Sequence, residues 1–143
     1  MSVLPAGYEL TEDPLAIDPV AAHAYLTTSY WAEGIPLETV VRSIQGSFCI
    51  AVRKDGAQIG FARIISDFAT FAYLADVYVL EAHRGRGIAQ AMLAYLVEHA
   101  RLQGLRRWAL FTKDAQSLYA RFGWAQYRNP ERMMTRDFVE VYQ

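Results

Sequence analysis

Two arginines and two glycines alternate in one short stretch of the chain, Arg84-Gly85-Arg86-Gly87-Ile88-Ala89. An amphipathic run follows, so the stretch should lead into a helix, whose free N–H groups and positive dipole end attract phosphate. Glycines remove the Cβ atoms that would keep an anion from the backbone, and arginines add charge-assisted hydrogen bonds. The stretch predicts a pyrophosphate-binding turn; the alternative is a tight strand-to-helix connection without a ligand.

The spacing of this stretch excludes two familiar phosphate motifs. A dinucleotide fingerprint needs glycine or another small residue at Gln90, and an acidic residue about 20 positions downstream in an N-terminal βαβ unit. A Walker A motif ends in Gly-Lys-Ser/Thr, which is absent here. Both nicotinamide dinucleotides and nucleoside triphosphates are therefore poor candidates for the ligand.

The first half of the chain predicts two helices and four strands. A short strand is expected at Tyr8–Thr11, and Asp18 followed by Pro19 is typical of a helix N-terminus. Pro36 opens a second helical pattern that stops near Gly46. β-rich runs then cover residues 48–53, 58–66 and 70–80, and short turns separate them. These runs predict an antiparallel meander.

The second half supplies a crossover and a short β-rich tail. Helical periodicity covers residues 88–100, with Gly104 as the expected stop, and a buried-type strand follows at 108–112. A helix is expected at 115–121, and strands at 124–127 and 133–137. The order β-α-α-β-β-β-α-β-α-β-β predicts one α+β domain over residues 1–143, with a mostly antiparallel central sheet. The one parallel pair is expected within residues 70–112.

Residues 77–93 resemble the acetyl-coenzyme A signature of the GNAT superfamily of N-acetyltransferases. That signature, Arg/Gln-x-x-Gly-x-Gly/Ala after a strand, reads here Arg84-x-x-Gly87-x-Ala89 after Val77-Tyr78-Val79. A second landmark of the family, a short helix with Leu-Tyr followed by a Gly-Phe-like pair, reads Leu118-Tyr119 and then Gly123-Trp124. The order of elements agrees over nearly the whole chain. The resemblance implies a GNAT fold, with helices on both faces of the sheet, and an N-acetyltransferase that uses acetyl-coenzyme A.

The resemblance also implies which residues bind this co-substrate. The pyrophosphate would lie on the turn, and the pantetheine amides would pair with backbone groups of Val77 and Val79. Asp114 stands where the family often has an asparagine that meets the pantetheine arm, and an aspartate cannot donate as that amide does. The residues of the turn are Arg84, Gly85, Arg86, Gly87, Ile88 and Ala89.

The family attacks the thioester directly with the acceptor amine, so the resemblance implies the same reaction here. Deprotonating an alkylammonium at pH 7 costs about 4 kcal/mol. Asp76, a charge in an apolar strand, is the candidate base; the alternative is an ion pair with a neighbour such as Arg63. Tyr119 is the candidate general acid for the leaving thiolate; the alternative is a half-buried core tyrosine.

The acceptor would lie near Tyr30, Trp31, Arg63, Asp67 and Tyr73, although such aromatics also pack in cores. It would be a small-molecule amine or a protein or peptide amine. The first 41 residues hold six acids and no lysine or arginine, which favours a cationic acceptor. These acids are Glu9, Glu12, Asp13, Asp18, Glu33 and Glu38.

Composition limits the remaining classes. A net charge of −1 argues against a general nucleic-acid binder. No secretory signal or membrane-spanning run is recognised, the histidines lack metal-ligand spacing, and Cys49 in an apolar strand indicates a buried hydrophobe. We therefore expect a cytoplasmic protein without a metal site; a homodimer stays open. The rival functions are a non-catalytic acyl-coenzyme A sensor and an interaction module with the same fold.

Overall fold

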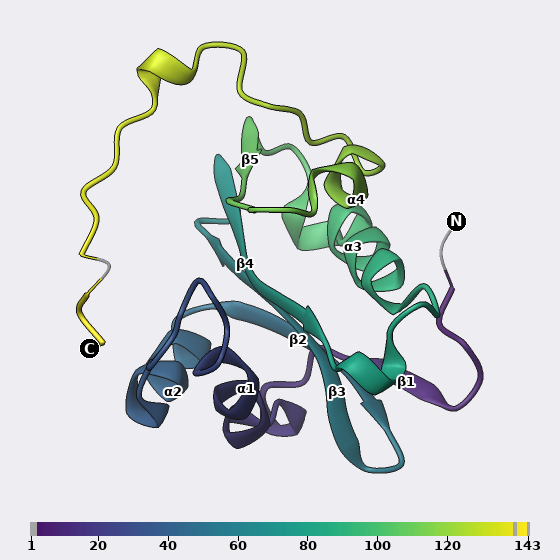
Figure 1. Ribbon diagram of the computed structural model, residues 1–143. Helices are drawn as coiled ribbons and strands as arrows, with labels where there is room; N and C mark the ends of the chain where they lie inside the picture. Colours follow the sequence, from purple (N-terminus) through teal and green to yellow (C-terminus); the bar gives the residue numbers. More distant parts are fainter. Residues whose placement is uncertain (1–2, 139, 143) are drawn as a thin grey trace.

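A single mixed sheet lies at the centre of the computed structural model, which describes residues 3–138 and 140–142 (Figure 1). In this part of the chain five strands occur in the order β1-β2-β3-β4-β5. The first four pair antiparallel, and β4 pairs with β5 in parallel. The predicted mixed fold, its meander and its parallel pair are confirmed. The strands are β1 Tyr8–Thr11, β2 Phe48–Lys54, β3 Ala57–Ser66, β4 Phe71–Val79 and β5 Arg107–Ala109.

The helices begin where the sequence predicts. Asp18 caps the first helix by accepting hydrogen bonds from the N–H groups of Val20 and Ala21, and Pro19 occupies its first position. Pro36 precedes the second helix, and Gly46 ends it. The α-helices are α1 Pro19–Leu26, α2 Leu37–Gln45, α3 Ile88–Glu98 and α4 Gln116–Ala120. Short 3₁₀ turns occupy Pro14–Ala16, Glu81–His83, Ala100–Leu102 and Pro130–Arg132.

The helices cover opposite faces of the sheet, so the core has two parts (Figure 1). Alternate residues of a strand point to opposite faces. Ile50 therefore packs in the cluster that contains α3, whereas Ala51 packs in the cluster that contains α1 and α2. Of the described residues, none belongs to a helix that is both long and apolar enough to cross a membrane.

The two strands predicted after α4 are not formed. Residues 124–127 and 133–137 have no strand partner among the described residues, and residues 133–138 are exposed. In Figure 1 the segment after α4 passes β5 and then runs outside the body of the molecule to the side of α2. A β-rich pattern gives a strand only where another backbone lies alongside it, which explains the error.

The third helix ends earlier than predicted. It stops at Glu98, whereas Gly104 was the expected stop. His99 leaves the helical conformation with φ −63° and ψ 134°, and its ring Nδ1 accepts the Arg101 N–H at 3.1 Å. This side-chain acceptor starts a 3₁₀ turn, so the local hydrogen bond ends the helix before the glycine is reached.

Candidate active site

A bulge in β4 places Asp76 in the part of the strand that is not paired with β5. The β3–β4 register shifts between Phe61 and Arg63, and Asp76 has a left-handed φ of 57°. A non-glycine residue in this conformation is uncommon, and aspartate tolerates it better than most. Because a bulge bends its strand and redirects a side chain, it is a common feature next to active sites.

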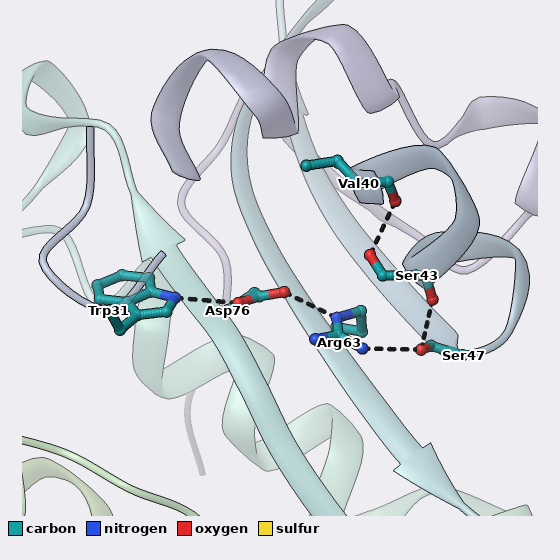
Figure 2. Close-up of polar contacts among 6 residues, drawn as sticks. All are labelled: Trp31, Val40, Ser43, Ser47, Arg63 and Asp76. Atoms are coloured by element: carbon teal, nitrogen blue, oxygen red, sulfur yellow. Dashed lines mark hydrogen bonds and ion pairs between the residues drawn. The ribbon is translucent and has the colours of Figure 1, made fainter. Parts of the chain in front are cut away.

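Hydrogen bonds occupy both carboxylate oxygens of Asp76 (Figure 2). Trp31 donates its indole N–H to Oδ1 at 3.0 Å, and Arg63 donates Nε to Oδ2 at 2.7 Å. Arg63 also donates Nη1 to the Ser47 hydroxyl at 3.1 Å, and Ser47 donates to the Ser43 carbonyl of α2. The Arg63 and Asp76 side chains are only 15% and 10% exposed. The ion pair considered from the sequence is therefore present.

A cavity of about 650 Å³ lies over this bulge. It contains eight of the predicted site residues and thus unites segments from both halves of the chain. They are Tyr30, Trp31, Arg63, Tyr73, Asp76, Val77, Asp114 and Tyr119. Further lining residues escaped the sequence analysis, among them Thr39, Ser43, Phe111, Lys113 and Tyr142. Thr39 and Ser43 look like ordinary polar positions of an amphipathic helix, so no sequence signal distinguishes them.

One aromatic side chain connects two loops that line the cavity and lie far apart in the sequence. The Tyr30 hydroxyl, from the α1–α2 loop, accepts the backbone N–H of Lys113 at 3.0 Å. The Lys113 ammonium lies 5.4 Å from the centre of the same ring. A cation near an aromatic face adds a favourable electrostatic contact. Tyr30 therefore joins the loop that carries Trp31 to the loop that carries Asp114.

Tyr119 lines the same cavity with a phenol that resists ionisation. Burial, followed by the nearby Tyr30 and Asp114, raises the pKa of Tyr119 to about 12. The neutral hydroxyl is therefore the stable form at every pH at which the protein would work. A neutral phenol can donate a hydrogen bond or a proton into the cavity.

The glycine turn has the conformation that an anion site needs. Gly85 and Gly87 have φ values of 77° and 78°, and a Cβ built on either would meet no protein atom within 4 Å. Gly87 caps α3, and no side chain accepts its first N–H groups. Space and free donors therefore coincide at the helix N-terminus, where the dipole favours negative charge. The turn fits a pyrophosphate.

Two residues predicted to bind the co-substrate, Arg84 and Val79, are hydrogen-bonded to each other. Arg84 donates Nε to the Val79 carbonyl at 2.9 Å and Nη2 to the Tyr25 hydroxyl at 3.1 Å. Arg84 therefore also fastens the turn to β4 and α1. Val77 lines the cavity, whereas Val79 is buried in the core and is not among the lining residues. The Val79 carbonyl is thus already bonded within the protein, and only Val77 of the two lies at the cavity.

Asp67 lies outside the cavity lining and organises a turn. Its carboxylate accepts hydrogen bonds from the backbone N–H groups of Ala69, Thr70 and Phe71, which hold its pKa well below the usual range. Such bonds are typical of an Asx turn between strands. Asp67 therefore shapes the β3–β4 connection rather than the acceptor site.

Cys49 is buried and unreactive. Burial raises the pKa of its thiol to about 12, so the thiolate is scarce at neutral pH. This agrees with the buried hydrophobe predicted from the sequence. It also argues against an acyl-cysteine route.

Comparisons with known proteins agree with the family resemblance and with the fold. A model of the acetyltransferase (GNAT) family matches residues 11–124. A presumed acetyltransferase of Gibberella zeae is 30% identical over 150 residues, which cover 88% of this chain and 84% of that protein. The crystal structure of a presumed GNAT acetyltransferase from Xanthomonas campestris pv. campestris is 42% identical, with a TM-score of 0.93, and the match covers 98% and 99% of the two chains.

A more distant structure shares the fold alone. It is a presumed acetyltransferase of Clostridium acetobutylicum, crystallised with acetyl-coenzyme A. It is 18% identical with a TM-score of 0.66, and the match covers 95% of this chain and 98% of that one. The family match spans most of the chain and includes the glycine turn and every residue named above as lining the cavity except Tyr142. The chain therefore belongs to the GNAT family of acetyltransferases.

Proposed function

We propose that this chain is an N-acetyltransferase that transfers the acetyl group of acetyl-coenzyme A to a primary amine. The observation that carries the proposal is the cavity, which brings Asp76, Tyr119 and Val77 together where β4 and β5 separate. Only Phe71–Tyr73 of β4 pair with β5, so the rest of that edge of β4 has no partner in β5. An extended pantetheine arm could pair with this edge as a strand would.

The glycine turn would hold the pyrophosphate of this co-substrate. Its open space and uncapped N–H groups supply donors, and Arg86 adds an exposed positive charge. Asp114 would face the pantetheine arm from the loop after β5. Acetyl-coenzyme A binds as a substrate and supplies the activated thioester.

Asp76 would bind the acceptor nitrogen and accept its proton, directly or through a water molecule. Each carboxylate oxygen has a second lone pair beyond the one used by Trp31 or Arg63, so a third donor can still be accepted. The amine nitrogen then forms a bond to the thioester carbonyl carbon. When the tetrahedral adduct collapses, the C–S bond breaks and the amide remains.

Tyr119 would act on the departing sulfur. A free thiol has a pKa of about 8.5, so proton transfer from a phenol of pKa about 12 is uphill by about 5 kcal/mol. The hydroxyl therefore contributes mainly as a hydrogen-bond donor to the developing negative charge. The coenzyme A thiolate therefore leaves with this hydrogen bond, and it is neutralised by the second proton that the nitrogen loses as the amide forms.

A combined turnover and binding experiment tests the proposal. Acetyl-coenzyme A should raise the melting temperature, and addition of a suitable amine should release coenzyme A thiol. A stabilised protein without thiol release across a broad amine panel would indicate a sensor. No stabilisation by millimolar coenzyme A or acetyl-coenzyme A would indicate an interaction module whose glycine turn is only structural.

A cytosolic location and a homodimer are part of the same proposal. Residues Met133, Met134, Phe138 and Val141 expose apolar side chains along the C-terminal segment, which stands off the body of the molecule (Figure 1). A second copy could cover them. Sedimentation at increasing protein concentration tests this, and a monomer at high micromolar concentration would refute it.

A further inference from the structure

We infer that the acceptor is a primary monoamine carried on a flat aromatic body, as in an arylalkylamine. The inference rests on the proposed function, because it assigns a substrate class to the same cavity. It narrows the acceptor within the range left by the sequence, which was a small-molecule amine or a protein or peptide amine. Three observations support it: the walls of the cavity, its balance of charge, and the way Trp31 is held.

Two pairs of aromatic side chains, called here the aromatic walls, line the cavity. Tyr30 and Trp31 stand edge-to-face on the α1–α2 loop, with ring centres 5.1 Å apart. Tyr73 and Phe111, whose ring centres are 5.9 Å apart, come from β4 and from the segment after β5. Trp31 and Phe111 belong to the exposed large hydrophobics although they line a cavity. An aromatic guest would bury these ring faces and gain edge or offset contacts.

The charges that line the cavity balance. Arg63 and Asp76 neutralise each other in the ion pair, and Lys113 and Asp114 contribute one charge of each sign. None of the six acids in the first 41 residues is among the lining residues. The charge argument for a strongly cationic acceptor therefore does not apply to this cavity. A polyamine would bring charges that no surplus of carboxylates compensates.

The guanidinium that lines the cavity is already paired with a carboxylate of the protein. Arg63 already donates to Asp76 and Ser47, and its side chain is 15% exposed. An amino acid captured through its carboxylate would have to share Arg63 with Asp76, whose charge already neutralises the guanidinium. The site therefore favours an acceptor without a carboxylate beside its amine.

Trp31 connects the aromatic wall with the amine position. Its indole N–H donates to Asp76 (Figure 2). Trp31 also lines the cavity. An ammonium at Asp76 and a ring against Trp31 can belong to one molecule if a short linker joins them. This places the reacting nitrogen at the bulge and the aromatic body against the aromatic walls.

Initial rates of thiol release with a designed set of amines test the inference. The set contains 2-phenylethylamine, the equally large but saturated 2-cyclohexylethylamine, spermidine, phenylalanine and a lysine-containing peptide. The kcat/KM for 2-phenylethylamine should exceed that for spermidine by about tenfold or more, because a ring is buried. It should exceed that for 2-cyclohexylethylamine by about two- to tenfold, because only a planar ring makes edge contacts. Preference for spermidine, phenylalanine or the peptide would overturn the inference.

A pair of matched variants separates the cavity from the general surface. Phe111 lines the cavity and is 66% exposed, whereas Phe138 is 65% exposed and lies outside the lining. Phe111→Ala should lower kcat/KM for 2-phenylethylamine by about tenfold and leave that for spermidine within about twofold. Phe138→Ala should change neither value. Equal losses for all amines in Phe111→Ala would overturn the inference.

A binding measurement keeps the inference separate from the proposed activity. Calorimetric titration of 2-phenylethylamine into the coenzyme A-loaded protein requires no turnover. Binding that Phe111→Ala weakens, without thiol release from acetyl-coenzyme A, would refute the activity but support the aromatic site. Rapid acetylation of spermidine with no preference for an aromatic ring would support the proposed activity and refute the aromatic acceptor site. If 2-phenylethylamine is neither bound nor acetylated, the inference is overturned.

Discussion

Replacing Tyr119 by phenylalanine removes one hydroxyl and keeps the ring that packs against Trp124, whose centre lies 5.9 Å away. The variant should therefore fold normally. A hydrogen bond to a charged acceptor contributes roughly 1.5–3 kcal/mol, and about 1.4 kcal/mol corresponds to a tenfold change in rate. If the hydroxyl stabilises the departing thiolate, kcat should fall by about 10- to 150-fold. The KM for acetyl-coenzyme A should change by less than about threefold, because the bond forms mainly in the transition state.

The pH dependence makes this prediction sharper. Because burial raises the pKa of Tyr119 to about 12, its proton is retained at every practical assay pH. Ionisation of Tyr119 should therefore cause no loss of kcat up to pH 10, and the wild-type protein and Tyr119→Phe should have pH profiles of the same shape. Rates are measured from pH 6 to 10 by thiol release under saturating substrates, with Tyr127→Phe as a control outside the cavity lining. Unchanged turnover, or a loss near pH 8–9 that the variant abolishes, would refute this role.

Three further changes probe the turn, the bulge and the core. Gly87→Ala, at a φ of 78°, should cost about 1 kcal/mol of stability and raise the KM for acetyl-coenzyme A about tenfold, as measured by melting and kinetics. Asp76→Asn should lower kcat at least about 100-fold and destabilise the protein by about 3 kcal/mol in urea titrations, whereas Asp55→Asn, at a similar φ of 51°, should do neither. Folded Cys49 keeps its proton until about pH 12 while the unfolded thiol ionises from pH 9, so stability should fall over that range, by at most about 4 kcal/mol. Cys49→Ala should flatten this fall, and an unchanged slope would contradict the assignment.

The elements that local chemistry decides were predictable from the sequence. The capping of α1 by Asp18 depends on neighbours only two or three residues away, and it formed as expected. The meander likewise follows from short turns between consecutive runs. The strands at 124–127 and 133–137 could not be judged in this way, because a strand needs a partner from elsewhere in the chain. The pattern was β-rich, but no described backbone pairs with it.

The same distinction applies to the candidate site. The glycine turn is continuous in sequence, so its conformation at Gly85 and Gly87 follows from the residues themselves. The contact between Trp31 and Asp76 spans 45 positions, and that between Tyr30 and Lys113 spans 83. Their charge and aromatic character singled out some of these residues in the sequence, but they did not predict which residues would contact each other. Whether Asp67 would face the cavity or close a turn was likewise decided by its contacts in the folded chain.

The bulge at Asp76 and the short β4–β5 pairing together explain why the cavity forms where it does. Pairing with β5 stops at Tyr73, and three residues later the left-handed conformation of Asp76 interrupts the register with β3. A regular strand would direct this side chain by simple alternation and continue the ladder on both edges. A left-handed aspartate costs about 1 kcal/mol or more, so the surrounding contacts must hold it there. Trp31 and Arg63 provide those contacts. Removing either side chain should therefore release the backbone of the bulge and also free the Asp76 carboxylate at the acceptor site.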